Sequence, residues 1–284
     1  MSFDRIHPWL LRAVWAALPF TAGPGLASAL DGWAHPARTV ATVGLWAGWG
    51  VVLVATLVPL PLGLTALRVG APAALAASAA AASPVGAAWG VLVVVVAFLP
   101  ATGLWCVNGT AYPNERRFPL RAPGWLLIGP LPIAWAVAVG GPVTGALLLA
   151  EKHWVAGGVV LAVGVALAVV LARALHGLSR RWVVFVPAGL VVHDHLALRD
   201  PVLFMREMVE TLGPAPADTD ALDLTLGSPG LAVELVLLEK VPMTLAGRGR
   251  QKGETGASAR LMFTPTRPGA VLAEARTRRL RVAS

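Results

Sequence analysis

The chain has few charged residues, a single cysteine and no recognisable catalytic motif. Charged side chains make up 13% of its 284 residues, about half the share in an ordinary soluble domain. Such a chain has too little polar surface to cover itself in water. The one cysteine, Cys106, excludes an intramolecular disulfide and a metal site built from several cysteines. No phosphate-binding loop, nucleophile elbow or zinc-protease motif is present, so we expect no catalytic residue, cofactor or metal ligand.

The charged residues that are present are unevenly distributed. Residues 1–177 hold 13 of the 38 Lys, Arg, Asp and Glu residues, and the last 107 residues hold the other 25. This asymmetry predicts a transmembrane helical domain over 1–178 and a water-soluble domain over 179–284. The net charge of +8 comes largely from basic residues near the expected membrane exits. We interpret it as a topology signal and expect no nucleic-acid partner.

Long apolar runs predict several membrane-spanning helices, since a bilayer core of about 30 Å needs about 20 apolar residues in helical conformation. Four strong runs and two weaker ones are present; the strong runs are 39–59, 85–105, 124–149 and 154–175, and the weaker are 9–30 and 64–83. The weaker runs contain Arg12 and Arg68, and a cation at membrane depth is a candidate functional residue unless it reaches the interface. We expect six crossings, with four crossings and two re-entrant or interfacial segments as the alternative.

Basic residues set the expected orientation. Arg116, Arg117 and Arg121 lie between the second and third strong runs, and Arg180 and Arg181 follow the last one. By the positive-inside rule both positions are cytoplasmic, and the basic N-terminal segment prefers the same side. The number of crossings before residue 106 is then even. We therefore expect a multi-pass protein of the bacterial inner membrane, with its N-terminus and its C-terminal domain in the cytoplasm.

Tryptophan and glycine positions predict contacts between helices. Four tryptophans lie away from the expected helix ends and are predicted to pack between helices: Trp46, Trp49, Trp89 and Trp135. Glycine pairs spaced by four residues let two helices approach closely. Three such pairs occur: Gly44 with Gly48, Gly86 with Gly90, and Gly141 with Gly145. They indicate internal packing, with a homo-oligomer interface as the alternative.

From residue 182 onward the apolar period changes from helical to two, which predicts β-strands. Residues 182–187 and 190–193 are expected to form one hairpin, and residues 222–226 and 231–238 a second. A last strand over 260–264 leads through prolines into a helix over 269–280, because proline is favourable near a helix start. The C-terminal domain is therefore expected to be small and mostly β, with one closing helix.

This order of hairpins, further strands and a closing helix resembles the bacterial pleckstrin-homology-like domains. The closest local match is residues 261–272, Leu-Met-Phe-Thr-Pro-Thr-Arg-Pro-Gly-Ala-Val-Leu, where the last strand turns through prolines into the helix. The whole chain, with its bias toward Ala, Val, Leu, Arg and Pro, also looks like multi-pass membrane proteins of high-GC actinobacteria. That likeness implies no activity.

Two basic clusters of the C-terminal domain are candidate contacts for anionic lipid headgroups or for a protein partner, since basic residues near a membrane surface contribute about 1 kcal/mol each. The first is Arg248, Arg250 and Lys252, in an expected mobile loop over 247–258, and the second is Arg276, Arg278 and Arg279 in the last helix. The alternative for both clusters is a solvated surface.

Histidines in the same domain carry two weaker indications. His193 and His195 are two apart on an expected strand and share a face, but no third metal ligand is evident. His195 and Asp200 have the spacing of a glycerolipid acyltransferase motif, without the rest of that pattern.

The function we expect is that of a non-enzymatic membrane scaffold or regulator whose cytoplasmic domain binds a protein partner or lipid headgroups. A small transporter or channel with a cytoplasmic regulatory domain is the alternative, and a membrane-embedded enzyme acting on lipid is a third possibility. The strong runs contain no acidic residue that could couple transport to the movement of an ion, which favours the first hypothesis.

Overall fold

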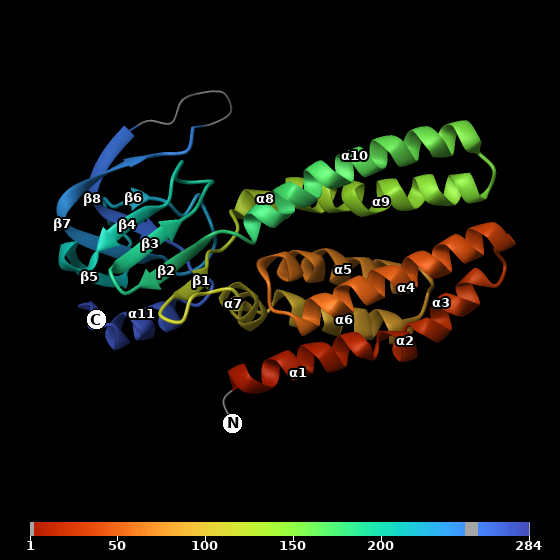
Figure 1. Ribbon diagram of the computed structural model, residues 1–284, viewed down its shortest axis with the longest axis horizontal. Helices are drawn as coiled ribbons and strands as arrows, with labels where there is room; N and C mark the ends of the chain where they lie inside the picture. Colours follow the sequence, from red (N-terminus) through yellow and green to blue (C-terminus); the bar gives the residue numbers. More distant parts are fainter. Residues whose placement is uncertain (1–2, 248–254, 284) are drawn as a thin grey trace. The chain divides into compact units, whose positions relative to one another are not determined.

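The computed structural model describes residues 3–247 and 255–283, and it divides into two compact units (Figure 1). The helical unit consists of Met1–Gly109 with Pro130–Ser179, and the β-rich unit of Thr110–Gly129 with Arg180–Ser284. The segment 110–129 leaves the helices and returns to them, yet it belongs with the β-rich unit. The charge distribution along the sequence gives no sign of this additional segment.

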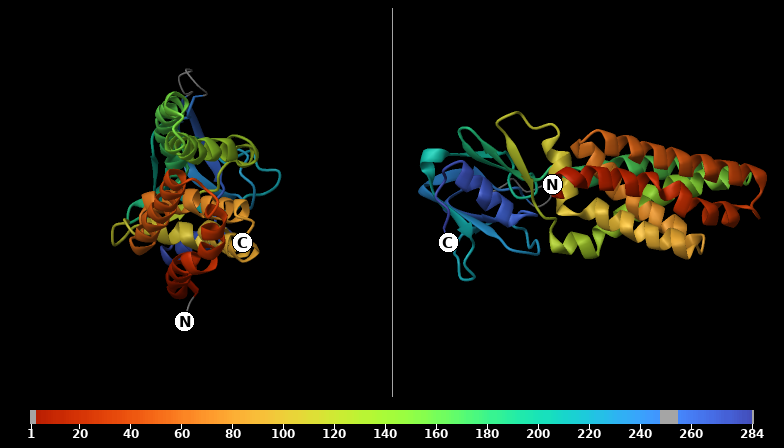
Figure 2. Two further views of the ribbon diagram at one scale, coloured as in Figure 1. Left: turned by 90° about the vertical axis from the view of Figure 1, so that its right-hand side faces the viewer. Right: turned by 90° about the horizontal axis from the view of Figure 1, so that it is seen from below.

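The helical unit contains α1 (Phe3–Ala16), α2 (Leu18–Thr21), α3 (Gly23–Leu30), α4 (His35–Leu57), α5 (Pro61–Ala80), α6 (Pro84–Phe98), α7 (Pro100–Asn108), α9 (Pro130–Ala150) and α10 (Trp154–Leu178). Five stretches of the described residues are long and apolar enough to cross a membrane: Ile6–Leu30, α4, α5, α9 and α10. The pair α6 and α7 forms a sixth if it is one span, although it bends by 53°. Within this unit the long helices run alongside one another (Figure 2).

Two of the strong apolar runs are interrupted by proline. The run 85–105 was expected to be one helix, but α6 ends at Phe98 and α7 begins at Pro100. Because the residue before a proline is pushed out of the helical region, Leu99 has φ −55° and ψ 139°. The run 124–149 also breaks before a proline, Pro130, and Gly129, with φ −122° and ψ −83°, separates the short helix α8 (Gly124–Ile128) from α9.

Three of the four inner tryptophans join helices as predicted. Their indole N–H groups donate to backbone carbonyls of neighbouring helices: Trp49 to Trp15 (3.1 Å), Trp89 to Val14 (2.9 Å) and Trp135 to Val69 (3.0 Å). The prediction is wrong for Trp46, which is 56% exposed on the outer face of α4. Spacing from a helix end therefore indicates depth along the helix but not which face a side chain occupies.

The glycine pairs differ in what surrounds them. A Cβ on Gly145 would lie 2.5 Å from the Cα of Leu161, so α9 and α10 touch through their backbones there. Around Gly44 and Gly48 nothing lies within 4 Å of such a Cβ. The pair in α9 therefore serves internal packing, as expected, and the pair in α4 has open space beside it.

Gly145→Val is predicted to destabilise the helical unit, because overpacking against backbone costs about 1–3 kcal/mol or more. Gly44→Val is the matched control, since the same side chain there meets open space, and we expect its melting temperature to equal that of the wild type. Thermal unfolding of the purified protein in detergent measures both. Equal effects of the two variants would contradict the close α9–α10 contact.

The β-rich unit contains two four-stranded sheets and a C-terminal helix. The first sheet has the order β1-β2-β3-β4 and the second β5-β7-β8-β6. The elements are β1 (Arg116–Pro119), β2 (Trp182–Val186), β3 (Gly189–His193), β4 (Val202–Met205), the 3₁₀ helix η1 (Arg206–Met208), β5 (Val209–Pro214), β6 (Leu222–Asp223), β7 (Val233–Thr244), β8 (Thr255–Phe263) and α11 (Pro268–Thr277). The hairpin of β2 with β3 and the C-terminal helix confirm two predictions.

The predicted second hairpin is wrong. Residues 222–226 contain only the short strand β6, which pairs in parallel with β8, and β7 pairs with β5 and β8. Alternating leucines correctly indicate one buried face, because Leu224 is 2% exposed. They carry no information about the pairing partner, which is fixed by contacts far along the chain.

The last strand is longer than predicted. The strand β7 continues past an irregularity to Thr244, and its final residues pair with Thr255–Ser258 of β8. The mobile loop predicted over 247–258 is therefore wrong for residues 255–258, which are part of a strand. Residues 248–254 lie outside the described residues.

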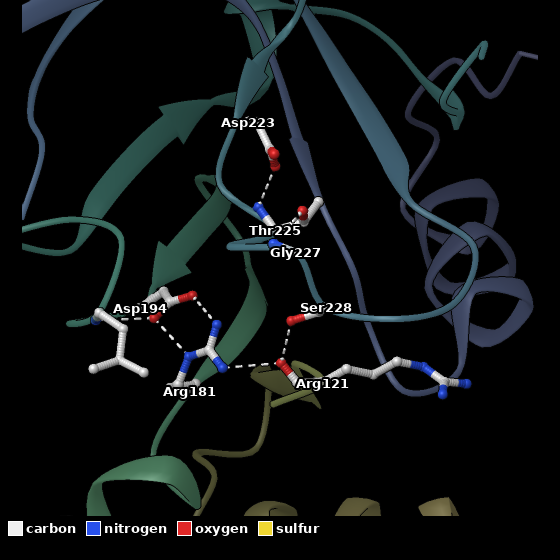
Figure 3. Close-up of polar contacts among 8 residues, drawn as sticks. Arg121, Arg181, Asp194, Asp223, Thr225, Gly227 and Ser228 are labelled. Atoms are coloured by element: carbon white, nitrogen blue, oxygen red, sulfur yellow. Dashed lines mark hydrogen bonds and ion pairs between the residues drawn. The ribbon is translucent and has the colours of Figure 1, made fainter. Parts of the chain in front are cut away.

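A buried ion pair joins the separate segments of the β-rich unit (Figure 3). The side chains of Arg181 and Asp194 are 1% and 0% exposed and are joined by two hydrogen bonds of 2.7 Å. The remaining Nη1 of Arg181 donates to the carbonyl oxygen of Arg121 (2.9 Å). The same carbonyl accepts the hydroxyl of Ser228, and the N–H of Arg121 donates to the carbonyl of Thr264. Segment 110–129 is thus fixed to both sheets.

Asp194→Asn is predicted to destabilise the β-rich unit by about 3–5 kcal/mol, because Arg181 would stay buried without its countercharge. The double variant Arg181→Met with Asp194→Leu should be less destabilised than either single charge removal, since no buried charge is left. Proteolysis of the full chain within 110–129, together with thermal unfolding, measures this. A double variant at least as unstable as the single one contradicts the ion pair's assigned role.

Candidate functional site

A shallow hollow of about 290 Å³ lies on the β-rich unit and is rich in arginine. It is lined by Arg206, Val209, Glu210, Leu238, Arg279, Leu280 and Arg281. The lining comes from η1, the start of β5, the middle of β7 and the residues after α11. Three guanidinium groups and one carboxylate give the hollow a net positive charge, while two leucines and a valine supply apolar contact.

The end of α11 shapes one side of this arginine hollow. The N–H of Arg279 donates to the carbonyl of Arg276 and the N–H of Leu280 to that of Ala275, which is the hydrogen-bond pattern of a Schellman helix end. Arg279 occupies the left-handed position of this motif, with φ +60°. Glycine is the residue that fits there at no steric cost, whereas a side chain costs about 1 kcal/mol. The fold thus holds an arginine at the hollow in spite of local strain.

The other two arginines are held by backbone contacts. A terminal nitrogen of Arg206 donates to the carbonyl of Arg278, at the C-terminal end of α11, where a cation is favourable. The carbonyl of Arg281 accepts the N–H of Leu212 (2.9 Å), and the N–H of Ala283 donates back to Leu212 (3.0 Å). These bonds hold the end of the chain against β5 and leave the side chain of Arg281 exposed.

The basic residues singled out in the sequence are only partly brought together. Arg279 lines the hollow, Arg278 is paired with Glu274 (2.8 Å), and Arg276 is exposed outside it. Arg248, Arg250 and Lys252 lie outside the described residues. The sequence did not mark Arg206, because it belongs to a short 3₁₀ turn that no local pattern connects with the end of α11.

Comparison with known proteins gives no match: no family model fits the chain, and no curated protein and no solved structure is similar to it. Any functional assignment therefore depends on the geometry of the sites themselves.

The two arginines of the helical unit have different surroundings. Arg12 donates from Nε to the carbonyl of Thr56 (3.0 Å) and from Nη2 to that of Leu57 (3.3 Å), at the end of α4. Its guanidinium also lies over the rings of Trp9 (5.0 Å) and Trp105 (5.8 Å). Arg12 therefore satisfies the C-terminal carbonyls of a neighbouring helix, which is a structural role.

Arg68, in α5, differs from Arg12. Its Nε is buried and has no hydrogen-bond partner among the described residues. The group lies 5.7 Å from the ring of Phe98, the last residue of α6, and within electrostatic reach of Cys106 in α7. Arg68 is thus beside the bend between α6 and α7.

Two histidines of the helical unit bind threonine hydroxyls. His7 is 1% exposed and its Nε2 lies 2.9 Å from Oγ1 of Thr102, in the first turn of α7. At the end of α10, Nδ1 of His176 lies 2.9 Å from Oγ1 of Thr65, which also donates to Ser179 (3.2 Å). Both pairs join helices that are distant in sequence.

The histidines of the β-rich unit are used separately. Asp194, which lies between His193 and His195 in the sequence, forms an ion pair with Arg181. The ring of His193 stacks on that of Trp182, with 5.4 Å between the ring centroids. Burial, and after it the charge of Arg180, lowers the pKa of His193. His195 and Asp200 are both exposed. The structure gives no support to a catalytic histidine–aspartate pair.

A second ion pair stabilises the start of segment 110–129. Arg117 donates to both carboxylate oxygens of Glu115 (3.1 and 3.0 Å), and the N–H of Tyr112 donates to one of them (3.0 Å). Burial alone raises the pKa of Glu115, but the hydrogen bonds and charge of Arg117 and the N–H of Tyr112 outweigh it and lower the pKa. The guanidinium of Arg117 also lies 5.2 Å from the Trp182 ring.

Glu115→Gln is predicted to destabilise the protein by about 1 kcal/mol at pH 7, as expected for a partly exposed pair. A carboxyl with a lowered folded pKa stabilises fully above its unfolded value of about 4.3 and loses this contribution as the pH falls through the folded value. The melting temperatures of wild type and variant should therefore differ by a constant amount above about pH 5 and converge below about pH 4. A difference that is independent of pH contradicts the ionised pair.

Proposed function

We propose that the chain is a multi-pass protein of the bacterial inner membrane, with six crossings and with its N-terminus and β-rich unit in the cytoplasm. In this proposal it is a non-enzymatic scaffold or regulator, and its arginine hollow binds an acidic segment of a protein partner. The β-rich unit is taken as pleckstrin-homology-like, a resemblance supported by two four-stranded sheets followed by one helix.

The apolar outer faces of the helices support insertion in a bilayer. Val155, Val159 and Val163 follow one another along α10 at helical spacing and are 83%, 60% and 54% exposed. Such a stripe is costly in water and favourable in hydrocarbon. The same holds for Ile133 on α9, which is 65% exposed.

The two chain segments that form the β-rich unit support the proposed orientation. Segments 110–129 and 180–284 belong to one compact unit, so both must be on the same side of any bilayer that α9 and α10 cross. The number of crossings between them is therefore even, as expected for this helix pair. Arg116, Arg117 and Arg180 then favour the cytoplasm by the positive-inside rule.

The arginine hollow carries the functional part of the proposal. Arginine with apolar side chains is the composition typical of protein interfaces, where a guanidinium binds carboxylates in a bidentate way. The hollow also lies at the turn between β2 and β3, since the N–H of Arg206, which lines it, donates to the carbonyl of Ala188 (2.9 Å).

The test uses the full chain in phosphatidylcholine nanodiscs and a fluorescent hexaglutamate peptide as the probe. We expect salt-sensitive binding by the wild type and at least about tenfold weaker binding when Arg206, Arg279 and Arg281 are changed to alanine. The matched control changes Arg180, Arg199 and Arg276 to alanine; it removes the same charge from exposed positions outside the hollow. Arg279→Gly should also weaken binding while leaving the melting temperature equal or higher, because it relieves the left-handed strain.

Equal losses of binding in the two triple variants would show that net charge, and not the hollow, attracts the peptide. If hexaglutamate does not bind but soluble glycerol phosphate does, and only with the hollow intact, a lipid headgroup replaces the protein partner in the proposal.

One observation favours the alternative function of a small transporter or channel. The pair α6 and α7 is bent by 53° at Pro100, and transporters often build their substrate sites from broken helices. Binding of a soluble anion at Arg68 would support this alternative.

A further inference from the structure

A guanidinium with an unsatisfied donor lies at the broken span of the helical unit. The Nε of Arg68 is buried and has no hydrogen-bond partner among the described residues. A guanidinium carries five N–H donors in a planar fork that matches phosphate and carboxylate groups. Arg12, the arginine of the other weak apolar run, donates to two backbone carbonyls of α4. We infer that Arg68 binds a phosphate group from outside the chain, beside the bend between α6 and α7.

The depth of Arg68 suits such a ligand. Arg68 is seven residues after Pro61, the first residue of α5, which corresponds to about 10 Å along the helix. Side chains on a helix lean toward its N-terminus, so the guanidinium lies closer to that end than its Cα does. In the proposed topology this is the cytoplasmic end, near the level of the inner-leaflet phosphates. The phosphate can therefore come from a phospholipid headgroup or from the cytoplasm.

The described surroundings of Arg68 supply no acidic side chain. The ring of Phe98 lies 5.7 Å from the guanidinium carbon, and Cys106, which is 0% exposed, belongs to the next helix. Neither is an anion under ordinary conditions, so the charge of Arg68 stays uncompensated within the described residues. A buried, uncompensated charge is costly in a membrane, and an anionic ligand relieves that cost.

The experiment measures the melting temperature of delipidated full-length protein in detergent, by tryptophan fluorescence. The additives are phosphatidylglycerol, phosphate-free dioleoylglycerol and inorganic phosphate. We expect phosphatidylglycerol or inorganic phosphate to raise the melting temperature by about 4 °C or more at 100 times Kd, and dioleoylglycerol to leave it unchanged. A response to phosphatidylglycerol identifies a headgroup as the source of the phosphate, and a response to inorganic phosphate alone identifies a soluble anion and supports the transporter alternative.

The variants isolate Arg68. Arg68→Gln should abolish the shift, and Arg68→Lys, which keeps the charge but not the fork, should weaken binding about tenfold. Arg173→Gln is the matched control, because it removes an exposed arginine of α10 and should keep the full shift. The shift should also persist when Arg206, Arg279 and Arg281 are changed to alanine, which separates this site from the arginine hollow.

Three results overturn the inference: no shift of the wild type with either phosphate compound, a full shift in Arg68→Gln, or the same loss in Arg68→Gln and Arg173→Gln. If Arg68→Gln does not fold, the melting-temperature shifts of the wild type and of Arg68→Lys test the inference. A lysine variant with unchanged affinity would mean that the guanidinium fork makes no specific contact with the phosphate.

Discussion

The β-rich unit depends on one buried ion pair, that of Arg181 with Asp194. Its two hydrogen bonds of 2.7 Å balance the charges, and the third contact of Arg181, to the carbonyl of Arg121, attaches a segment from 60 residues earlier in the chain. A buried charge of this kind is stable only if all its partners are in place. The position of segment 110–129 is therefore coupled to the folding of the residues that follow α10.

The chain passes between the two units three times, at residues 109/110, 129/130 and 179/180. Residues 180–284 alone therefore lack the edge strand β1, which belongs to segment 110–129.

The sequence predicts those features that depend on local pattern. Apolar length indicates the helices, period-two alternation indicates β2 and β3, and prolines before residue 269 indicate the start of α11. What it cannot predict depends on distant contacts: β1 comes from a short loop, β6 pairs with β8, and Arg206 meets the end of α11. Leu224 illustrates the limit, because its burial follows from alternation but its neighbours do not.

The arginines of the two weaker apolar runs show why a charge in such a run has no fixed meaning. Arg12 and Arg68 are equivalent in sequence, since each is a single cation in a weak span. Arg12 meets the last turn of α4, where backbone carbonyls have no partner in their own helix and accept its N–H groups. Arg68 faces a phenyl ring and a thiol at a helix bend, and neither can replace a carbonyl as an acceptor. The two arginines therefore differ in which helix end each one meets.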